Sequence, residues 1–569
     1  MNRIYRYAML MSAALLPVFA AAQNLDPTVE VSRAYEGSLV EVHKPAMMMS
    51  VPDTVQQFRL DFDYSVFDSP YKGSYEFNPY MASMRPAPSL SDVRNFYLRA
   101  GAGYRLHPVA DIIWSPDFKK GFRMDVYASH RSYVGDYRNI YLVKSGQGYD
   151  LDRVGEKLHG YDLRTDAGVS GRYEWQKGTF DFDLSYLGIH SRLDTLKHEK
   201  GVSRSYDSFN ASFGVASKAA RTFFYDLAFN YTFAEDKAAD YLQENVCSIN
   251  VDLGPQFRTA HRILFNLGAE LAQYSGYLDW GTARMNITPH YVYKKGRWHL
   301  DAGVRVDFLV GSDDTETLRS VKRQQFVYPD VHVEFTAIRD AMNVYAEATG
   351  GTRLNTYSGI VSRNHFADVH FLAGNLLDSE VERLRAVLGL KGRIGSRFSY
   401  DLSGGYAGYA NSIFDAIAVL PDSRILPAIG YATAQKAFVE LDWLLDTERF
   451  RFDGNVVFAH YWGFEDALGI FAPASVTGNT SMEYNIRKRI YIGLDCAFAS
   501  RRRMVEVSEG LSAVSIPAYA DLGLSFEYAL SRKLSLWARG GNLLNMTIQR
   551  TPLYAEGGIN FTAGICLNL

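Results

Sequence analysis

Alternation of apolar and polar residues with a period of two recurs along most of this chain and restricts the folds open to it. In the last segment, residues 559–569, apolar side chains occupy the odd positions and small or polar ones the even positions. Successive side chains of a β-strand point to opposite faces, so such a segment presents one apolar and one polar face. The same pattern recurs in the segments 60–66, 180–186, 490–498 and 522–530. The sequence therefore predicts an all-β protein.

Two kinds of connection separate the strand patterns. Ten are short and mostly basic: 115–121, 176–178, 217–221, 258–261, 294–297, 338–340, 394–397, 446–449, 487–489 and 531–533. Longer polar or mixed connections lie between them, including 135–160, 311–325, 352–381, 411–430 and 500–517. Strict alternation of short turns and longer loops is typical of outer-membrane barrels, whereas a soluble sandwich shares only the strand pattern.

The ten short turns imply about twenty strands, to which the first and last strands are added. We predict a transmembrane antiparallel β-barrel of about 22 strands, with 16–22 plausible because one misread hairpin changes the count by two. The segment 57–67 alternates near the start of the chain. It is predicted to pair with the C-terminal strand and to close the barrel.

The first 22 residues have the order of a secretory signal peptide. Arg3 and Arg6 precede an apolar stretch, residues 8–22, that ends in small residues. A basic start, an apolar middle and a small-residue end predict cleavage before Gln23. A short membrane anchor is the alternative, but the stretch is short for a span and contains Pro17.

No apolar run of about 18 residues follows Gln23, so the mature chain has no predicted helical span. A chain that crosses a membrane without helices has to form a closed barrel, since lipid satisfies no backbone hydrogen bond. We predict a signal peptide at 1–22, an extended periplasmic segment at 23–56 and an outer-membrane β-barrel at 57–569. The proline-containing stretch 69–92 is predicted to be a long first loop or a segment folded into the lumen.

Composition excludes a nucleic-acid partner and decides little else. The chain has 60 Lys+Arg against 63 Asp+Glu, a formal net charge of −3, so it lacks the basic surface that nucleic acids require. Cys247, Cys496 and Cys566 lie far apart with no CxxC spacing. We interpret them as small residues in strands, and a disulfide between two of them stays open.

The last 239 residues of the chain, from Val331 to Leu569, resemble the barrel of TonB-dependent outer-membrane receptors. The resemblance rests on the order of several short motifs: Tyr519–Leu524, Leu534–Leu536, Asn542–Asn545, Gly557–Gly558, Phe561, Ala563–Gly564, Gly350–Asn355 and Asn375–Glu380. The step Asn542–Asn545 is similar to the one that precedes the last hairpin of that family. The resemblance implies a barrel of twenty-two strands, in agreement with the count of turns, and a role in transport across the outer membrane of a Gram-negative bacterium.

Two departures from the family limit what the resemblance implies. Only about 34 residues, 23–56, lie between the signal peptide and the first predicted strand, which is too short for a plug domain with its own core. Thr28–Val31 has a loose likeness to the box that contacts TonB. Energy-coupled uptake by this chain alone is therefore not expected. Leu569 also replaces the common terminal aromatic, a minor departure.

No catalytic, cofactor-binding or metal site is predicted, and the chain is not expected to be an enzyme. His130-Arg131-Ser132 and His190-Ser191 place imidazoles beside hydroxyls, but adjacent strand residues such as His190 and Ser191 face opposite ways. Asp313, Asp314 and Glu316 lack the spacing of a calcium loop and are interpreted as a solvated loop. Arg501–Arg503 would sit at the outer rim, either on lipopolysaccharide phosphates or as a basic loop start. The residues predicted to line the lumen include Asp181, Asp183, Ser185, Asp521, Ser525 and Glu527.

Two functions follow from these predictions. The first is passage of a solute through the barrel, with a gate formed by loops or by a partner such as a lipoprotein. The second is a structural or assembly platform that binds other envelope proteins. Expected partners are outer-membrane lipids and another envelope protein, and no cofactor is expected. A barrel this wide is normally plugged, so something has to close it in either case.

Overall fold

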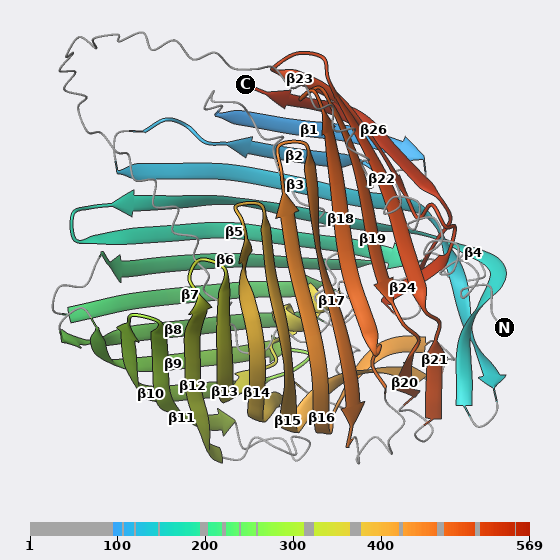
Figure 1. The fold of residues 1–569 in the computed structure, drawn as a ribbon. Helices are drawn as coiled ribbons and strands as arrows, with labels where there is room; N and C mark the ends of the chain where they lie inside the picture. Colours follow the sequence, from blue (N-terminus) through green and yellow to red (C-terminus); the bar gives the residue numbers. More distant parts are fainter. Residues whose placement is uncertain are drawn as a thin grey trace, which may run out of the picture. The chain divides into compact units, whose positions relative to one another are not determined.

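The alternating segments form long antiparallel strands, each hydrogen-bonded to its neighbours, that close into a barrel of 22 strands (Figure 1). This is a computed structural model, and it describes residues 95–569 except 105–106, 119–120, 146–147, 194–202, 219–222, 238–240, 258–259, 312–323, 365–376, 420–424, 464–471, 507–511 and 552–553. The predicted fold class is confirmed. All described residues belong to one unit, residues 69–569.

The barrel strands of the first half are β1 (Phe96–Tyr104), β2 (Val109–Trp114), β3 (Phe122–Ser145), β4 (Gly148–Glu174), β5 (Gly178–Leu193), β6 (Arg204–Ser217), β7 (Phe223–Lys237), β8 (Tyr241–Phe257), β9 (His261–Gly276), β10 (Trp280–Lys295) and β11 (Trp298–Gly311). Those of the second half are β12 (Gln324–Ile338), β13 (Met342–Leu354), β14 (Ser379–Ile394), β15 (Phe398–Val419), β16 (Ile425–Asp446), β17 (Phe450–Trp462), β18 (Val476–Ile486), β19 (Ile490–Ala499), β22 (Tyr519–Ala529), β23 (Leu534–Gly541) and β26 (Asn560–Asn568).

The ten predicted short turns all join consecutive barrel strands at one end, which we call the short-turn end. The hairpin of β10 and β11, for example, turns at Gly296, whose φ of 64° is readily adopted by glycine. The described chain begins and ends at this same end, since Phe96 N–H donates to the Leu569 carbonyl at 3.0 Å. In outer-membrane barrels the short turns are periplasmic. The opposite, long-loop end therefore faces the cell exterior.

The strand that closes the barrel differs from the predicted one. β26 pairs with β23 on one side and with β1 on the other, with Ala100 opposite Ile565. Both edges of β26 are thus occupied, so the predicted pairing of residues 57–67 with it is wrong. Alternation reveals the two faces of a strand and does not identify its neighbour. Residues 57–67, the signal peptide and the segment 23–56 lie outside the described residues, where their assignments stay predictions.

The outer face of the barrel carries the surface that a lipid bilayer requires. Along β7, Phe223, Leu227 and Tyr231 are exposed at 52%, 41% and 38%. Phe223 and Tyr231 lie about 26 Å apart along the strand, close to the roughly 25 Å height of a membrane-facing apolar band. Exposed aromatic residues flank the band at the short-turn end (Trp114, Tyr173, Phe223, Phe257, Trp298 and Tyr484) and at the other (Phe209, Tyr231, Phe458 and Phe561).

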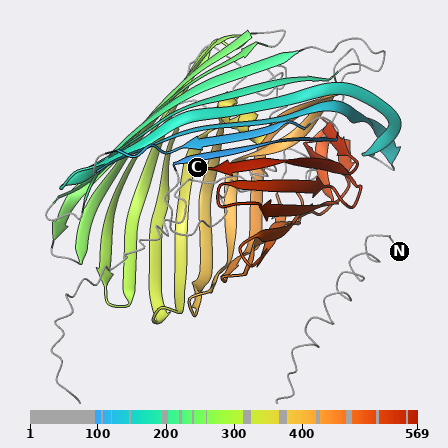
Figure 2. The same cartoon turned by 90° about the horizontal axis from the view of Figure 1, so that it is seen from above.

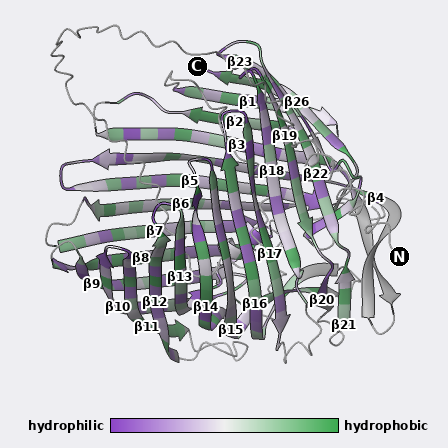
Figure 3. Ribbon diagram, in the orientation of Figure 1, coloured by the Kyte–Doolittle hydropathy of each residue, from purple (hydrophilic) through white to green (hydrophobic). Residues whose placement is uncertain are grey.

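The alternation that produces this face is visible along the strands in Figure 3. An exposed apolar band between aromatic girdles is the mark of an outer-membrane barrel, so the predicted location agrees with the structure. No helix among the described residues is long and apolar enough to cross a membrane.

Four short strands lie outside the barrel wall. They are β20 (Arg502–Glu506), β21 (Ser512–Ile516), β24 (Thr547–Thr551) and β25 (Tyr554–Gly557). β20 pairs in parallel with β15, and β21 pairs in parallel with β4. β3 and β4 are the longest strands described, with 24 and 27 residues, and their hairpin curves beyond its neighbours (Figure 2). These additions build up the long-loop end.

The step Asn542–Asn545, which carried part of the family resemblance, forms a tight turn between β23 and β24. Asn542 and Asn545 have φ angles of 48° and 53°, a left-handed conformation that asparagine tolerates. The Asn542 side chain donates to the Met546 carbonyl at 2.7 Å and accepts from the Met546 N–H at 2.9 Å. Its backbone N–H donates to Asp521 Oδ1 at 3.0 Å. The motif is therefore structural.

Substitution of this asparagine should destabilise the barrel. Asn542→Ala leaves buried polar groups of the turn without partners and puts alanine in a left-handed conformation, which should cost about 1–3 kcal/mol of unfolding free energy. The midpoint of heat-induced unfolding in detergent measures the effect. Leu544→Ala, at a side chain that is 50% exposed, is the matched control. Equal midpoints for the two variants would contradict this role of the asparagine.

Candidate functional site

The connection between β13 and β14 contains a short helix, α2 (Tyr357–Arg363), which packs against the inner wall of the barrel. Thr356 is its N-cap and accepts a hydrogen bond from the Gly359 N–H at 3.1 Å. Tyr357, Ile360 and Val361 are buried. The helix therefore lies inside the lumen at the long-loop end, within the connection that the sequence predicted as a loop over 352–381.

The apolar side of α2 rests on inward-facing residues of the strands β5 to β10. The buried cluster consists of Ile189, Tyr206, Ala234, Leu242, Val246, Ala272, Tyr274, Leu278 and Trp280 from this wall, Tyr357, Ile360 and Val361 from α2, and Leu377 and Ile429. Ile429 belongs to β16, on a distant part of the wall. The helix is thus held by an apolar core formed mainly with β5 to β10, where a barrel interior would otherwise be polar.

Two buried carboxylates of the wall, Asp236 and Glu244, hold the first turn of α2, and we call them the latch. The Tyr357 hydroxyl donates to Asp236 Oδ2 at 2.5 Å, and Arg204 Nε donates to the same oxygen at 2.9 Å. The two oxygens of Glu244 accept the backbone N–H groups of Tyr357 and Ser358 at 2.7 and 2.9 Å. Asp236 is 0% and Glu244 is 1% exposed, so water does not compete for these bonds.

A second set of bonds fixes the ends of the same connection. Asn355 Nδ2 donates to the Asp378 carbonyl at 2.9 Å, and the Asp378 N–H donates to the Tyr431 hydroxyl at 3.1 Å. Asn411 Nδ2 donates to Asp378 Oδ2 at 3.1 Å. Before the helix, the Thr352 N–H donates to the buried Asp307 Oδ2 at 2.8 Å. Both ends of the connection are therefore anchored to the wall.

Below α2 the inner wall is polar, as the alternation predicted. Leu184, Leu524 and Phe526 are exposed on the outer face, so Asp181, Asp183 and Ser185 on β5, and Asp521, Ser525 and Glu527 on β22, face the lumen. Three of these residues contact side chains of nearby strands: Asp181 pairs with Arg172, Asp521 with Arg550, and Glu527 bonds to Ser535. The predicted lumenal positions are confirmed.

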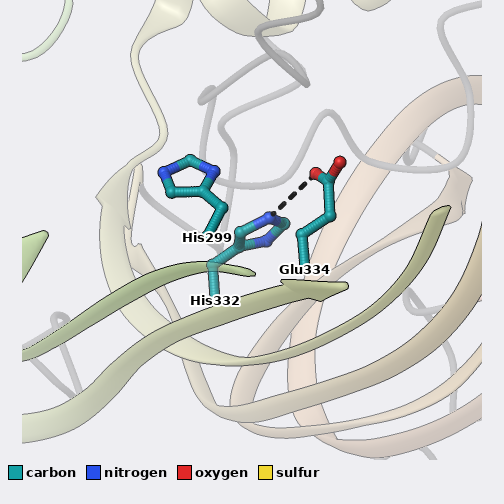
Figure 4. A group of neighbouring side chains, drawn as sticks. All are labelled: His299, His332 and Glu334. Atoms are coloured by element: carbon teal, nitrogen blue, oxygen red, sulfur yellow. Dashed lines mark ion pairs between the residues drawn. The ribbon is translucent and has the colours of Figure 1, made fainter. Parts of the chain in front are cut away.

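Near the short-turn end, the wall brings together His299 on β11 with His332 and Glu334 on β12 (Figure 4). One potential ligand atom from each residue lies within 4.8 Å of the others. His332 Nδ1 is 2.9 Å from Glu347 Oε1, and Lys391 Nζ is 2.8 Å from Glu334 Oε2. Sequence spacing did not reveal this group because His299 and Glu334 meet only through the register of the two strands.

The residues considered for catalysis do not form a nucleophile–base pair among the described side chains. His130 Nδ1 lies 2.9 Å from the Thr165 hydroxyl, while the Ser132 hydroxyl donates to the Pro108 carbonyl. The three cysteines are free thiols.

Arg501–Arg503 lie at the long-loop end, where Arg502 donates to the backbone carbonyls of Gln549 and Arg550 at 2.6 and 2.8 Å. This arginine therefore has a structural role, and the lipopolysaccharide contact stays a prediction. Residues 313–316 and 28–31 lie outside the described part of the chain.

The α2 contact was missed, although the sequence carried a signal for it. On β5 the inward positions change from Asp181, Asp183 and Ser185 to Leu187 and Ile189, so the inward face becomes apolar near the long-loop end. A lumen face that turns apolar needs something to cover it. The signal does not say which loop provides the cover.

Comparisons with known proteins bear on the fold. No family model matches the chain, and no curated protein matches it. Solved structures of transporters and receptors do match the chain. The FrpB iron transporter from Neisseria meningitidis aligns with a TM-score of 0.60 and 11% identity, over 84% of this chain and 82% of its own.

The ferric enterobactin receptor PfeA from Pseudomonas aeruginosa aligns at 0.57 and 10%, over 84% and 80% of the two chains. The ferric-catecholate import receptor Fiu from E. coli K12 aligns at 0.59 and 9%, over 84% and 82%. The barrel that the resemblance to TonB-dependent receptors implied is confirmed at the level of fold.

Proposed function

On the premise of this shared barrel fold, we propose that the chain conducts a solute across the outer membrane and that its α2 connection is the gate. Barrels of this strand number have a lumen wide enough to need a plug. The observation that carries the proposal is the position of α2 inside the lumen, packed on one wall and latched by Asp236 and Glu244. Transport accounts for the fold better than catalysis, since the solved neighbours are transporters and receptors.

The gate depends on the free-energy difference between α2 packed on the wall and α2 displaced from it. The wall under α2 is apolar, so displacing the helix exposes that wall to water at a cost of about 25 cal/mol per Å². The hydrogen bonds of the latch also stabilise the closed position, and they fix the orientation of the helix. A solute or partner that binds the displaced form better would shift the balance towards an open lumen. A lipoprotein or other envelope protein at the long-loop end is the partner class we propose for this.

Liposome swelling tests the proposal. The intact protein should admit small sugars slowly. A variant in which residues 355–378 are replaced by a glycine–serine linker of equal length should admit them at a rate on the order of an open porin's. Equal, negligible rates for the two forms would contradict a loop-gated passage. In that case the platform function becomes the better reading, and an envelope protein recovered in equal amount with the tagged chain would support it.

A further inference from the structure

We propose that His299, His332 and Glu334 form a binding site for a divalent transition metal ion on the lumen wall near the short-turn end (Figure 4). His299 lies directly opposite Glu334 in the register of β11 and β12, and His332 lies two residues before Glu334. All three side chains therefore project from one face of the sheet. The proposal concerns binding at this site and does not depend on the gate.

The three ligand atoms, within 4.8 Å of one another, are near the spacing that a bound ion imposes. Zinc binds histidine nitrogen and carboxylate oxygen at about 2.0–2.2 Å, so its tetrahedral ligands lie roughly 3.3 Å apart. His332 Nε2 and Glu334 Oε2 are already 3.7 Å apart. Small rotations of side chains that are only partly buried would complete the set.

A second carboxylate orients His332 as a metal ligand. Its Nδ1 is 2.9 Å from Glu347 Oε1, and since a carboxylate accepts, Nδ1 donates the proton. This bond leaves the other ring nitrogen, Nε2, directed towards Glu334. A carboxylate behind a histidine is the usual outer-shell partner of a metal-binding imidazole, because it fixes the tautomer and the ring orientation.

Lys391 occupies the place of a cation in the metal-free site. Its Nζ lies 2.8 Å from Glu334 Oε2, while Asn343 donates to Glu334 Oε1 at 2.7 Å. An ion that binds Glu334 has to displace the ammonium or share the carboxylate with it. Lys391 therefore weakens metal binding, and its removal should strengthen it, whereas removal of a purely structural lysine would not create metal affinity.

Two imidazoles and one carboxylate select the class of ion. This donor set suits zinc, copper(II) and nickel, whereas calcium and magnesium prefer oxygen ligands alone. Three protein ligands leave at least one coordination position open to the lumen.

The site lies level with the aromatic girdle of the short-turn end. Trp298, the neighbour of His299, is 52% exposed on the outer face, and its ring is 4.7 Å from that of Phe335. Ions should therefore reach the site from the periplasm while α2 stays closed.

Zinc titration of the intact, metal-stripped protein, purified in detergent without a polyhistidine tag, tests the site. Competition with a chromogenic chelator measures affinity, and the visible absorption of bound Co²⁺ reports the ligand geometry. We expect one strong equivalent. His299→Gln and His332→Gln should each weaken binding at least about tenfold, Glu347→Gln about 10–100-fold, and Lys391→Met should tighten it.

His261→Gln is the matched control. His261 begins β9 and lies on the outer face at the same end, where it contacts the hydroxyl of Tyr291, so its loss should leave the affinity unchanged. Heat-dependent gel migration checks that each variant is folded. The site is overturned if the intact protein and Lys391→Met both fail to bind zinc, or if His299→Gln and His332→Gln bind as tightly as the control. A variant without the α2 latch should bind zinc normally, which separates this site from the proposed gate.

Discussion

Removing the Asp236 and Glu244 carboxylates together should open the lumen. The double variant Asp236→Ala, Glu244→Ala leaves the Tyr357 hydroxyl and the N–H groups of Tyr357 and Ser358 without their present acceptors. Each buried polar group left unpaired costs about 1–3 kcal/mol. The sum for the three groups, roughly 3–9 kcal/mol, should raise the population of displaced α2 by at least about a hundredfold, because 1.4 kcal/mol is a factor of ten.

Single-channel recording in planar bilayers measures this opening. The double variant should show frequent, long openings where the unaltered protein shows rare ones. Glu235→Ala is the control, because Glu235 precedes Asp236 on the opposite face of β7 and pairs with Lys237. Tyr357→Phe removes one hydrogen bond and should have a smaller effect. Currents that do not differ between the double variant and the control would reject the latch.

A methyl group at Gly564 should prevent the barrel from closing properly. Gly564 lies opposite Gly101 where the first and last strands meet. A Cβ there would overlap the Ala100 carbonyl oxygen and Gly101 Cα, and both are backbone atoms that cannot rotate away. Overpacking of side chains alone costs about 1–3 kcal/mol, so a backbone clash at the closing pair of strands should cost about 3 kcal/mol or more.

Heat-dependent migration on a denaturing gel tests the seam, since a closed barrel migrates differently before and after boiling. Gly564→Ala should lose the folded band at a much lower temperature than the unaltered protein. Gly523→Ala is the matched control, a lumen-facing glycine of β22 whose added Cβ would meet no atom closer than 3.4 Å. If both variants melt together, the packing of this seam does not limit closure.

The strand pattern and the turns were accessible from the sequence because both are local. Alternation predicts which side chains share a face of a strand. A short basic connection, such as 394–397 or 487–489, predicts where one strand ends and the next begins in the opposite direction. All ten short turns were therefore found, and with them the strand count. Lumenal residues such as Asp181 and Glu527 followed from the same alternation.

The strand that closes the barrel could not be identified from local sequence patterns. Residues 57–67 and 96–104 both precede the first predicted turn, and the first alternates more clearly in sequence. β1 has small outward residues, Ala100 and Ala102, and its fit to β26 depends on Gly101 facing Gly564. The register between two strands about 460 residues apart is a property of the pair, and the sequence of either strand alone does not reveal it.

What the sequence by itself determined is the membrane barrel: all-β structure, number of strands, and an apolar outside with a polar inside. These properties follow from side-chain period and turn chemistry, which act over a few residues. Only the tertiary structure decided that α2 lies on Asp236 and Glu244, more than a hundred residues earlier, and that His299 faces Glu334. Such contacts depend on the curvature and closure of the whole wall, because closure brings distant strands to one lumen.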